Sequence, residues 1–285
     1  MKLTLILGTQ RSGSTLLCRE VEGLGGLGVP EEHLLPILRP PRPDLYGPGD
    51  VISALEEGIA PDLPGVTGVK LMVSYAGPIH HYVTGREAVD DVEALLGVIG
   101  WAQEAFEAVA LFAIRRQPLI DQAISRARAQ LTDIWHRNFA DAVDAVPAVA
   151  PALLYEEILR ELPLVLAESA ALDEVISACG ESVLTLDYDH LVEDRAQVLA
   201  AIGAHAQASG LLPLGRQADR PLRKIIPPAE GAQIRAGFEA WLSAAPMGAD
   251  AALLEEAGLG VWESTSGSTG PGDIEDRKVS AGSPR

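Results

Sequence analysis

The sequence predicts an α/β fold, a three-layer sandwich with a central parallel sheet and a P-loop-like phosphate-binding loop. Three observations support this prediction. Short apolar runs that suit buried strands alternate with longer stretches of helical periodicity. A polar, glycine-containing loop directly follows the first apolar run, and 47% of the 285 residues are hydrophobic, enough for a substantial core. The predicted strands begin near Leu3, Val69, Ala108 and Val183.

The first predicted strand, Leu3–Leu7, is apolar, contains β-branched residues and stops at Gly8. The next residues are small and polar, and Thr15 opens a stretch with helical periodicity. Gly8 and Gly13 allow the chain to turn sharply and to approach a ligand closely. A strand, a glycine loop and a helix form a phosphate-binding arrangement, because the N–H groups at a helix N-terminus and the helix dipole attract anions.

The loop has the spacing of a nucleotide phosphate loop with one change. Gly8, four residues and Gly13 are followed by Ser14 and Thr15, so that serine stands where the lysine of such loops contacts the β- and γ-phosphates. The cation lies earlier, at Arg11, whose guanidinium can meet a phosphate or sulfonate oxygen. The loop is therefore predicted to bind a phosphate ester other than a triphosphate. The spacing alone does not distinguish such a phosphate-binding loop from an ordinary βα turn rich in small residues, which stays the alternative.

Later elements follow the same alternation. Further strands are expected at Gly68–Ser74, Ala108–Ile114 and Ser182–Asp187, and helices at Val51–Gly58, Val83–Phe106, Arg195–Ala206 and Phe238–Ala257. Residues 1–263 are predicted to form one domain, and 264–285, which lack apolar periodicity, a disordered tail.

Composition excludes several classes of protein. The formal net charge of −18 argues against nucleic-acid and anionic-membrane binding, which need a basic face. Cys18 and Cys179 are the only cysteines and are expected to be buried small side chains without a disulfide or metal pattern. The chain has no signal peptide pattern and no apolar stretch of membrane-spanning length, so a cytoplasmic location is expected.

The loop motif resembles a known family. The run Thr-Gln-Arg-Ser-Gly-Ser-Thr-Leu-Leu at 9–17, followed by Gly-Val-Pro-Glu-Glu at 28–32, is similar to the opening of the bacterial sulfotransferases typified by trehalose 2-sulfotransferase. The resemblance implies 3′-phosphoadenosine 5′-phosphosulfate (PAPS) as sulfuryl donor and no metal. The loop residues that it assigns to the donor are Gln10, Arg11, Ser12, Gly13, Ser14 and Thr15.

The same resemblance implies the groups that carry out the reaction. Glu32 matches the carboxylate that serves as general base, and Lys70, on the strand Gly-Val-Lys-Leu-Met, matches a lysine that supports transferred charge beside Arg11. Met72 stands where the wider superfamily often has a catalytic histidine, which supports Glu32 as the base. Two alternatives stay open: Glu32 in the acidic first turn of a helix, and Lys70 as a strand-end lysine that reaches solvent.

His80 and His81 are the runner-up base. Glu31, next to the predicted base, is expected only in an acidic helix turn. His33-Leu34 replaces an aromatic pair of the family, and the segment between Glu32 and Lys70 is shorter than in trehalose sulfotransferases, which disfavours trehalose as acceptor.

Two further motifs are similar to the family's motifs that bind the 3′-phosphate of the donor. Arg116, after the third strand, and Ser125, in Gln-Ala-Ile-Ser on the next helix, match the residues that grip this phosphate. A late basic segment implies further donor contacts from Arg216 and Arg220. The alternatives are surface arginines and a solvated basic patch. Tyr188 is expected near the adenosine or in the core, and Arg126 and Arg128 at the surface or in an interface.

The predicted function is therefore a PAPS-dependent sulfotransferase that acts on a hydroxyl of a carbohydrate or natural product. The resemblance also implies a homodimer. The alternatives are a P-loop-type small-molecule kinase, which would need a replacement for the lysine missing at position 14, and a non-catalytic nucleotide-binding protein.

Overall fold

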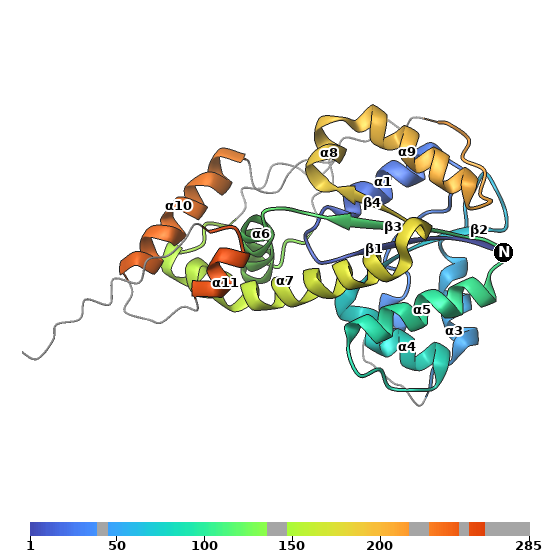
Figure 1. The fold of residues 1–285 in the computed structure, drawn as a ribbon, viewed down its shortest axis with the longest axis horizontal. Coiled ribbons are helices and arrows are strands. Elements are labelled where there is room, and N and C mark those ends of the chain that lie inside the picture. Colours follow the sequence, from blue (N-terminus) through green and yellow to red (C-terminus); the bar gives the residue numbers. More distant parts are fainter. Residues whose placement is uncertain (39–44, 136–146, 217–227, 245–250, 260–285) are drawn as a thin grey trace, which may run out of the picture.

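The chain forms a four-stranded parallel sheet with the strand order β2-β1-β3-β4. The computed structural model describes residues 1–38, 45–135, 147–216, 228–244 and 251–259. The strands are β1 (Lys2–Gly8), β2 (Val66–Met72), β3 (Val109–Arg115) and β4 (Val183–Asp187), with helices on both sides (Figure 1). The predicted α/β fold with a central parallel sheet is confirmed.

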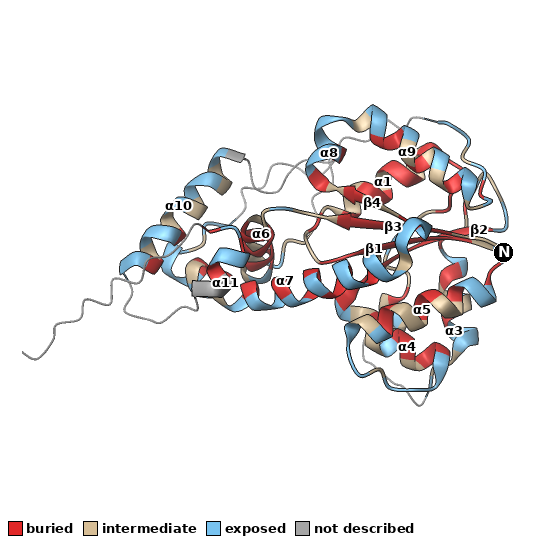
Figure 2. Cartoon of the chain, viewed as in Figure 1, coloured by how far each residue is buried: buried red, intermediate tan, exposed pale blue. Residues whose placement is uncertain are grey.

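Alternate residues of β1 face the two outer layers, as the geometry of a strand requires. Leu3, Leu5 and Leu7 pack against one layer, formed by α3 (Pro48–Glu56), α4 (Ala76–Thr84), α5 (Asp91–Ala105) and the end of α7 (Pro151–Cys179). Ile6 packs on the opposite face against α1 (Ser14–Leu24) and α9 (Arg195–Ala208). Figure 2 shows the buried residues of both layers turned toward the sheet.

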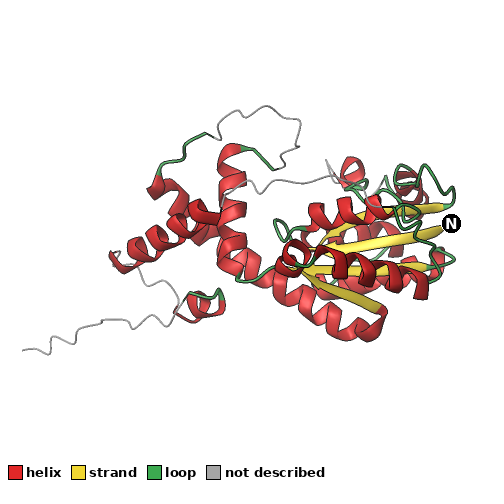
Figure 3. Ribbon diagram, turned by 90° about the horizontal axis from the view of Figure 1, so that it is seen from above, coloured by secondary structure: helices red, strands yellow, loops and turns green. Residues whose placement is uncertain are grey.

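A third apolar cluster lies beyond the sheet. It joins α6 (Leu119–Thr132), the first half of α7, α10 (Pro228–Ala244) and α11 (Ala251–Glu256) around the fully buried Phe238. Seen from above, these helices extend past the ends of the strands (Figure 3). The 29-residue α7 connects both regions, because Ile158 packs in this cluster and Val175 packs on the sheet.

One predicted helix is divided in the structure. The stretch Val83–Phe106 contains the end of α4 and the whole of α5, because Gly85, with φ +70°, ends α4 and Asp90 caps α5 through Glu93 N–H. The stretch 238–257 contains the end of α10 and the whole of α11, and residues 245–250 lie outside the described part of the chain. The short remaining elements are α2 (Leu35–Leu38), η1 (Val73–Tyr75), η2 (Gly180–Ser182) and α8 (Tyr188–Glu193).

The strand register brings the candidate residues to one edge of the sheet. Gly8 of β1 lies opposite Met72 of β2 and Ile114 of β3, so these strands end together. Glu31 bridges to Val69, and Lys70 N–H donates to Glu31 O at 2.9 Å, which places the segment before α2 alongside β2. Ligands bind at this carboxyl edge in open α/β sheets.

The prediction of one domain over 1–263 stays a prediction, and the expected tail 264–285 lies outside the described residues. In the part of the chain that is described, no helix has the length and apolar character needed to cross a membrane.

Candidate functional site

The loop between β1 and α1 is held in a tight turn at the carboxyl edge of the sheet. Ser12 donates to Thr9 O twice, through its backbone N–H at 3.2 Å and through its buried Oγ at 2.8 Å. Gly13 has φ +97°, and a Cβ at this position would lie 2.3 Å from Cδ2 of Tyr188. The N-cap residue of α1 is Gly13, which has no side chain to cap the helix, so the N–H groups of its first turn are suited to hold an anion.

Three of the predicted donor-binding residues meet at this loop. Arg11 Nε donates to Ser125 Oγ at 3.0 Å, and Arg11 Nη1 donates to the carbonyl of Trp135. Arg116 Nη1 donates to Arg11 O at 3.1 Å. The end of β3 and the helix α6 therefore contact the loop from one side, as expected from the sequence, and the roles of these residues stay predictions.

The site carries positive charge that no described carboxylate neutralises. Within the described residues, Arg11 and Arg116 form no ion pair with an acidic side chain, whereas most other described arginines do. The pKa of Arg11 is lowered to about 10, chiefly because the guanidinium is buried and secondly because Arg116 is close. Two neighbouring guanidinium groups without an acidic partner among the described residues favour the binding of a dianion.

The buried Lys70 pairs with the partly exposed Glu32 beside the loop. Lys70 Nζ lies 3.1 Å from Glu32 Oε1 and donates to Thr15 Oγ1, in the first turn of α1, at 3.1 Å. The side chain of Lys70 is only 5% exposed and that of Glu32 20%. Lys70 thus does not reach for solvent, and Glu32 lies outside any helix, so both alternative interpretations are wrong.

The neighbouring Glu31 differs from Glu32. Its carboxylate is 48% exposed and pairs with Arg19 Nη1 at 3.1 Å, on the outer side of α1. It too lies outside any helix, so its expected place in an acidic helix turn is wrong. It therefore offers a matched control for experiments on Glu32.

The runner-up base is not at the loop. His80 is buried in α4, where its Nδ1 lies 3.1 Å from Arg86 O, and His81 Nδ1 lies 2.9 Å from Glu87 Oε1. Both rings thus face the segment that follows α4.

Arg216 is also far from the loop. Its backbone N–H donates to Leu24 O, at the last residue of α1, and its guanidinium pairs with Asp62 at 2.7 Å. The 11 residues of α1 separate this position from the loop by about 16 Å at 1.5 Å per residue. Arg216 consequently does not join Arg11 and Arg116. Arg220, with the rest of the late basic segment, lies outside the described residues.

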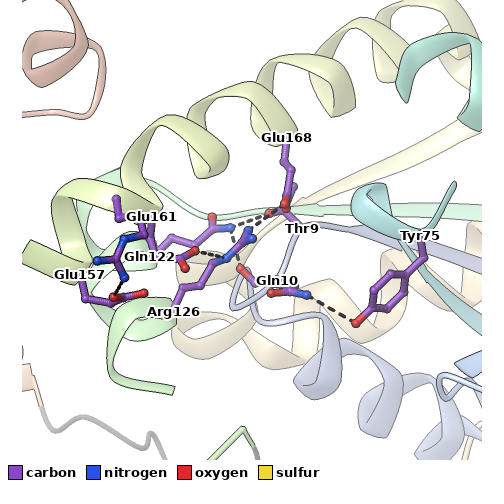
Figure 4. A network of polar contacts seen from close by, with 9 residues as sticks. Thr9, Gln10, Tyr75, Gln122, Arg126, Glu157, Glu161 and Glu168 are labelled. Atoms are coloured by element: carbon purple, nitrogen blue, oxygen red, sulfur yellow. Dashed lines mark hydrogen bonds and ion pairs between the residues drawn. The ribbon is translucent and has the colours of Figure 1, made fainter. Parts of the chain in front are cut away.

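The structure places Tyr188, expected near the adenosine or in the core, at the loop, and it adds Gln122 and Tyr75, which the sequence did not assign to the site. Tyr188 lies at the loop, where its ring packs on Gly13 and the Arg116 guanidinium stacks on it at 5.0 Å from the ring centre. Gln122 contacts the loop backbone, and Gln10 turns its amide toward Tyr75 (Figure 4). A tyrosine or a glutamine in an apolar stretch does not by itself indicate a functional site, since both residue types also occur in protein cores.

Arg126 is buried within the chain, which corrects the expectation that it lies at the surface or in an interface. It pairs with Glu161 at 2.5 Å and with Glu168 at 2.7 Å, both on α7 (Figure 4). Burial raises the pKa of Glu161, with Arg126 acting in the opposite direction. Arg128 pairs with Glu230 of α10, a partly exposed contact. In the sequence, the spacing of Glu157, Glu161 and Glu168 places these three acidic residues on one face of the helix, and this pattern could have indicated a cationic partner.

Cys18 is buried in α1 and is expected to resist alkylation. Burial raises its thiol pKa to about 12, with Lys70 lowering and Glu32 raising it by smaller amounts. Because the thiolate is the reactive form, and burial also raises the pKa of the half-buried Cys179, folded protein at pH 8 should react slowly at Cys179, and Cys18 should react only after unfolding. Mass spectrometry after iodoacetamide treatment, with and without urea, measures this. Rapid labelling of both thiols without urea would show that Cys18 is accessible.

Among the described residues, no group of three or more histidine, cysteine or acidic side chains is arranged to hold a metal ion.

No family model matches the chain. No curated protein matches it either. A solved structure, a sulfotransferase from Alicyclobacillus acidocaldarius, is similar over 88% of this chain and 93% of that chain, with 16% sequence identity and a TM-score of 0.43. A likeness of this strength carries no conclusion about activity.

Proposed function

We propose that this chain transfers a sulfuryl group from PAPS to a hydroxyl of a small carbohydrate or natural-product acceptor. The observation that carries the proposal is the contact between Lys70 and Thr15. In nucleotide phosphate loops, the hydroxyl at the position of Thr15 holds Mg²⁺. Here that hydroxyl accepts a hydrogen bond from an ammonium group, which favours a reaction supported by lysine over magnesium-dependent phosphoryl transfer.

The residues at the loop suit an adenosine nucleotide with two separate anionic groups. The first-turn amides of α1 and the Arg11 guanidinium would hold the 5′-phosphosulfate, and Arg116 and Ser125 the 3′-phosphate. Ser125 Oγ accepts from Arg11 Nε, so its own proton is left to donate to a phosphate oxygen. PAPS, when bound, supplies a sulfuryl group on a phosphate leaving group. The sequence resemblance to trehalose 2-sulfotransferases supports the same donor.

In this proposal Glu32 is the general base, and Lys70 stabilises the charge that develops during the transfer. Glu32 accepts the proton that the acceptor hydroxyl loses as its oxygen attacks sulfur. Lys70 uses two of its three N–H donors on Glu32 and Thr15, so that one is left for an oxygen of the transferred or leaving group. Its positive charge opposes the negative charge that develops there. Both side chains are largely shielded from water, which strengthens these interactions.

A transfer assay tests this function. The enzyme is incubated with PAPS labelled with ³⁵S and a mixture of sugars and phenols, with EDTA present in one arm. Transfer of label to an acceptor, unchanged by EDTA, is the expected result. Phosphorylation of an acceptor from magnesium ATP would favour the kinase instead, and absence of both reactions over a broad set of acceptors would favour a non-catalytic nucleotide-binding protein.

A further inference from the structure

We infer that Gln122 is a positioning residue, which holds the peptide between Gln10 and Arg11 so that the Arg11 guanidinium points into the anion site. The inference deepens the proposed function and rests on it for its ligand, but its geometric part can be tested without any ligand.

Gln122 contacts the loop at two points. Its Nε2 donates to Thr9 Oγ1 at 2.6 Å and to Gln10 O at 2.7 Å, and the residue is 1% exposed (Figure 4). Both hydrogens of one amide nitrogen are therefore used on the loop. Water cannot replace a donor at so buried a position, so the two contacts depend on Gln122 itself.

These contacts matter because Arg11 has an unusual backbone. Its φ of 67° lies in the left-handed region, which a residue with a side chain adopts at a cost. The peptide before Arg11 is fixed by the bond from Gln122 to Gln10 O. The peptide after it is fixed by the bond from Arg116 to Arg11 O. The two bonds together define φ and ψ of Arg11, and such a conformation persists only where its surroundings determine it.

The same helix also holds the side chain of Arg11. Gln122, Ser125 and Arg126 follow each other at the spacing of one helix face, and Ser125 Oγ accepts from Arg11 Nε at 3.0 Å. Arg126 fixes this face of α6 to Glu161 and Glu168 of α7. Helix α6 therefore fixes the position of both the backbone and the guanidinium of Arg11. The helix itself is held in place by the ion pairs of Arg126 with α7.

The test is NMR of arginine Nε–H groups in the full-length chain. In the unsubstituted protein, Arg11 and Arg126 should each give a distinct Nε–H signal that exchanges slowly with water, because both groups are held by buried partners. Gln122→Met keeps the length and packing of the side chain but removes its donors. It should shift the Arg11 signal and speed its exchange, while the Arg126 signal stays unchanged. Gln130→Met, at an exposed position of the same helix, is the control and should change neither signal.

Binding of adenosine 3′,5′-bisphosphate is the second readout. Gln122→Met should weaken this binding about tenfold. In the variant, the nucleotide would have to bring Arg11 back into the left-handed conformation, and the cost of that conformation corresponds to roughly this factor. An unchanged Arg11 signal would overturn the inference, and so would simultaneous loss of the Arg126 signal, which would make Gln122 a general packing residue. If the Arg11 signal changes as expected but the unsubstituted protein does not bind the nucleotide, the inference stands and the proposed function fails.

Discussion

Replacing Arg126 with alanine is expected to lower the free energy of unfolding by about 3–5 kcal/mol. Arg126 is buried between Glu161 and Glu168, and removal of the guanidinium would leave two carboxylates of α7 without their cation in a site from which water is largely excluded. Because this pairing joins α6 to α7, the loss should also loosen the helix that contacts the phosphate loop. Urea denaturation at pH 7, followed by circular dichroism, measures the change.

Arg128→Ala on the same helix is the control for this prediction. The Arg128 side chain is 12% exposed and that of its partner Glu230 40%, so this variant should lose less stability than Arg126→Ala, about 1–2 kcal/mol. A combined Arg126→Met, Glu161→Leu and Glu168→Leu variant should recover most of the lost stability, since no unpaired charge then remains. An Arg126→Ala variant as stable as Arg128→Ala would show that the buried ion pairs do not hold α6 in place.

Replacing Glu32 with glutamine is expected to reduce the rate of sulfuryl transfer about 10²–10⁴-fold, the usual contribution of a positioned general base. Glutamine keeps the size of the side chain and an oxygen that can accept from Lys70 Nζ, but it cannot take up the proton of the acceptor. Affinity for the donor should change little, because the loop and the two arginines remain. Steady-state rates together with a binding titration separate the two effects.

Glu31→Gln is the matched control for Glu32→Gln. Its carboxylate is adjacent in sequence but turned toward Arg19, so transfer should proceed at nearly the original rate. Equal losses in the two variants, or a rate for Glu32→Gln within a factor of three of the original, would remove Glu32 from the reaction and leave the base to be found elsewhere.

The parts of the fold and site that depend on local pattern could be predicted from the sequence. The strands are continuous apolar runs, and residues that follow parallel strands meet at one edge of the sheet, which is why Arg11 and Arg116 lie together. Ser125 was assigned through the resemblance of its Gln-Ala-Ile-Ser motif to the sulfotransferase family, and its role stays a prediction. Lys70 was assigned through the resemblance of its strand, Gly-Val-Lys-Leu-Met, to the same family.

What could not be predicted depends on partners distant in sequence. Arg126 has the same local pattern as a surface arginine, and only the packing of α7, more than 30 residues later, makes it a buried ion-pair partner. Arg216 was assigned by motif, but the segment that contains it returns along the far end of α1 to Asp62. The division of the stretch Val83–Phe106 follows from the positive φ of Gly85, where a turn competes with helical periodicity.

The central claim is that Arg11, Arg116 and the loop form a site for a 3′-phosphorylated adenosine nucleotide and not for a triphosphate. Calorimetric titration with adenosine 3′,5′-bisphosphate, compared with magnesium ATP, tests it most directly. We expect micromolar binding of the bisphosphate, about −8 kcal/mol, that is lost in Arg116→Ala and not matched by ATP. No binding of the bisphosphate, or tighter binding of magnesium ATP, would contradict the account.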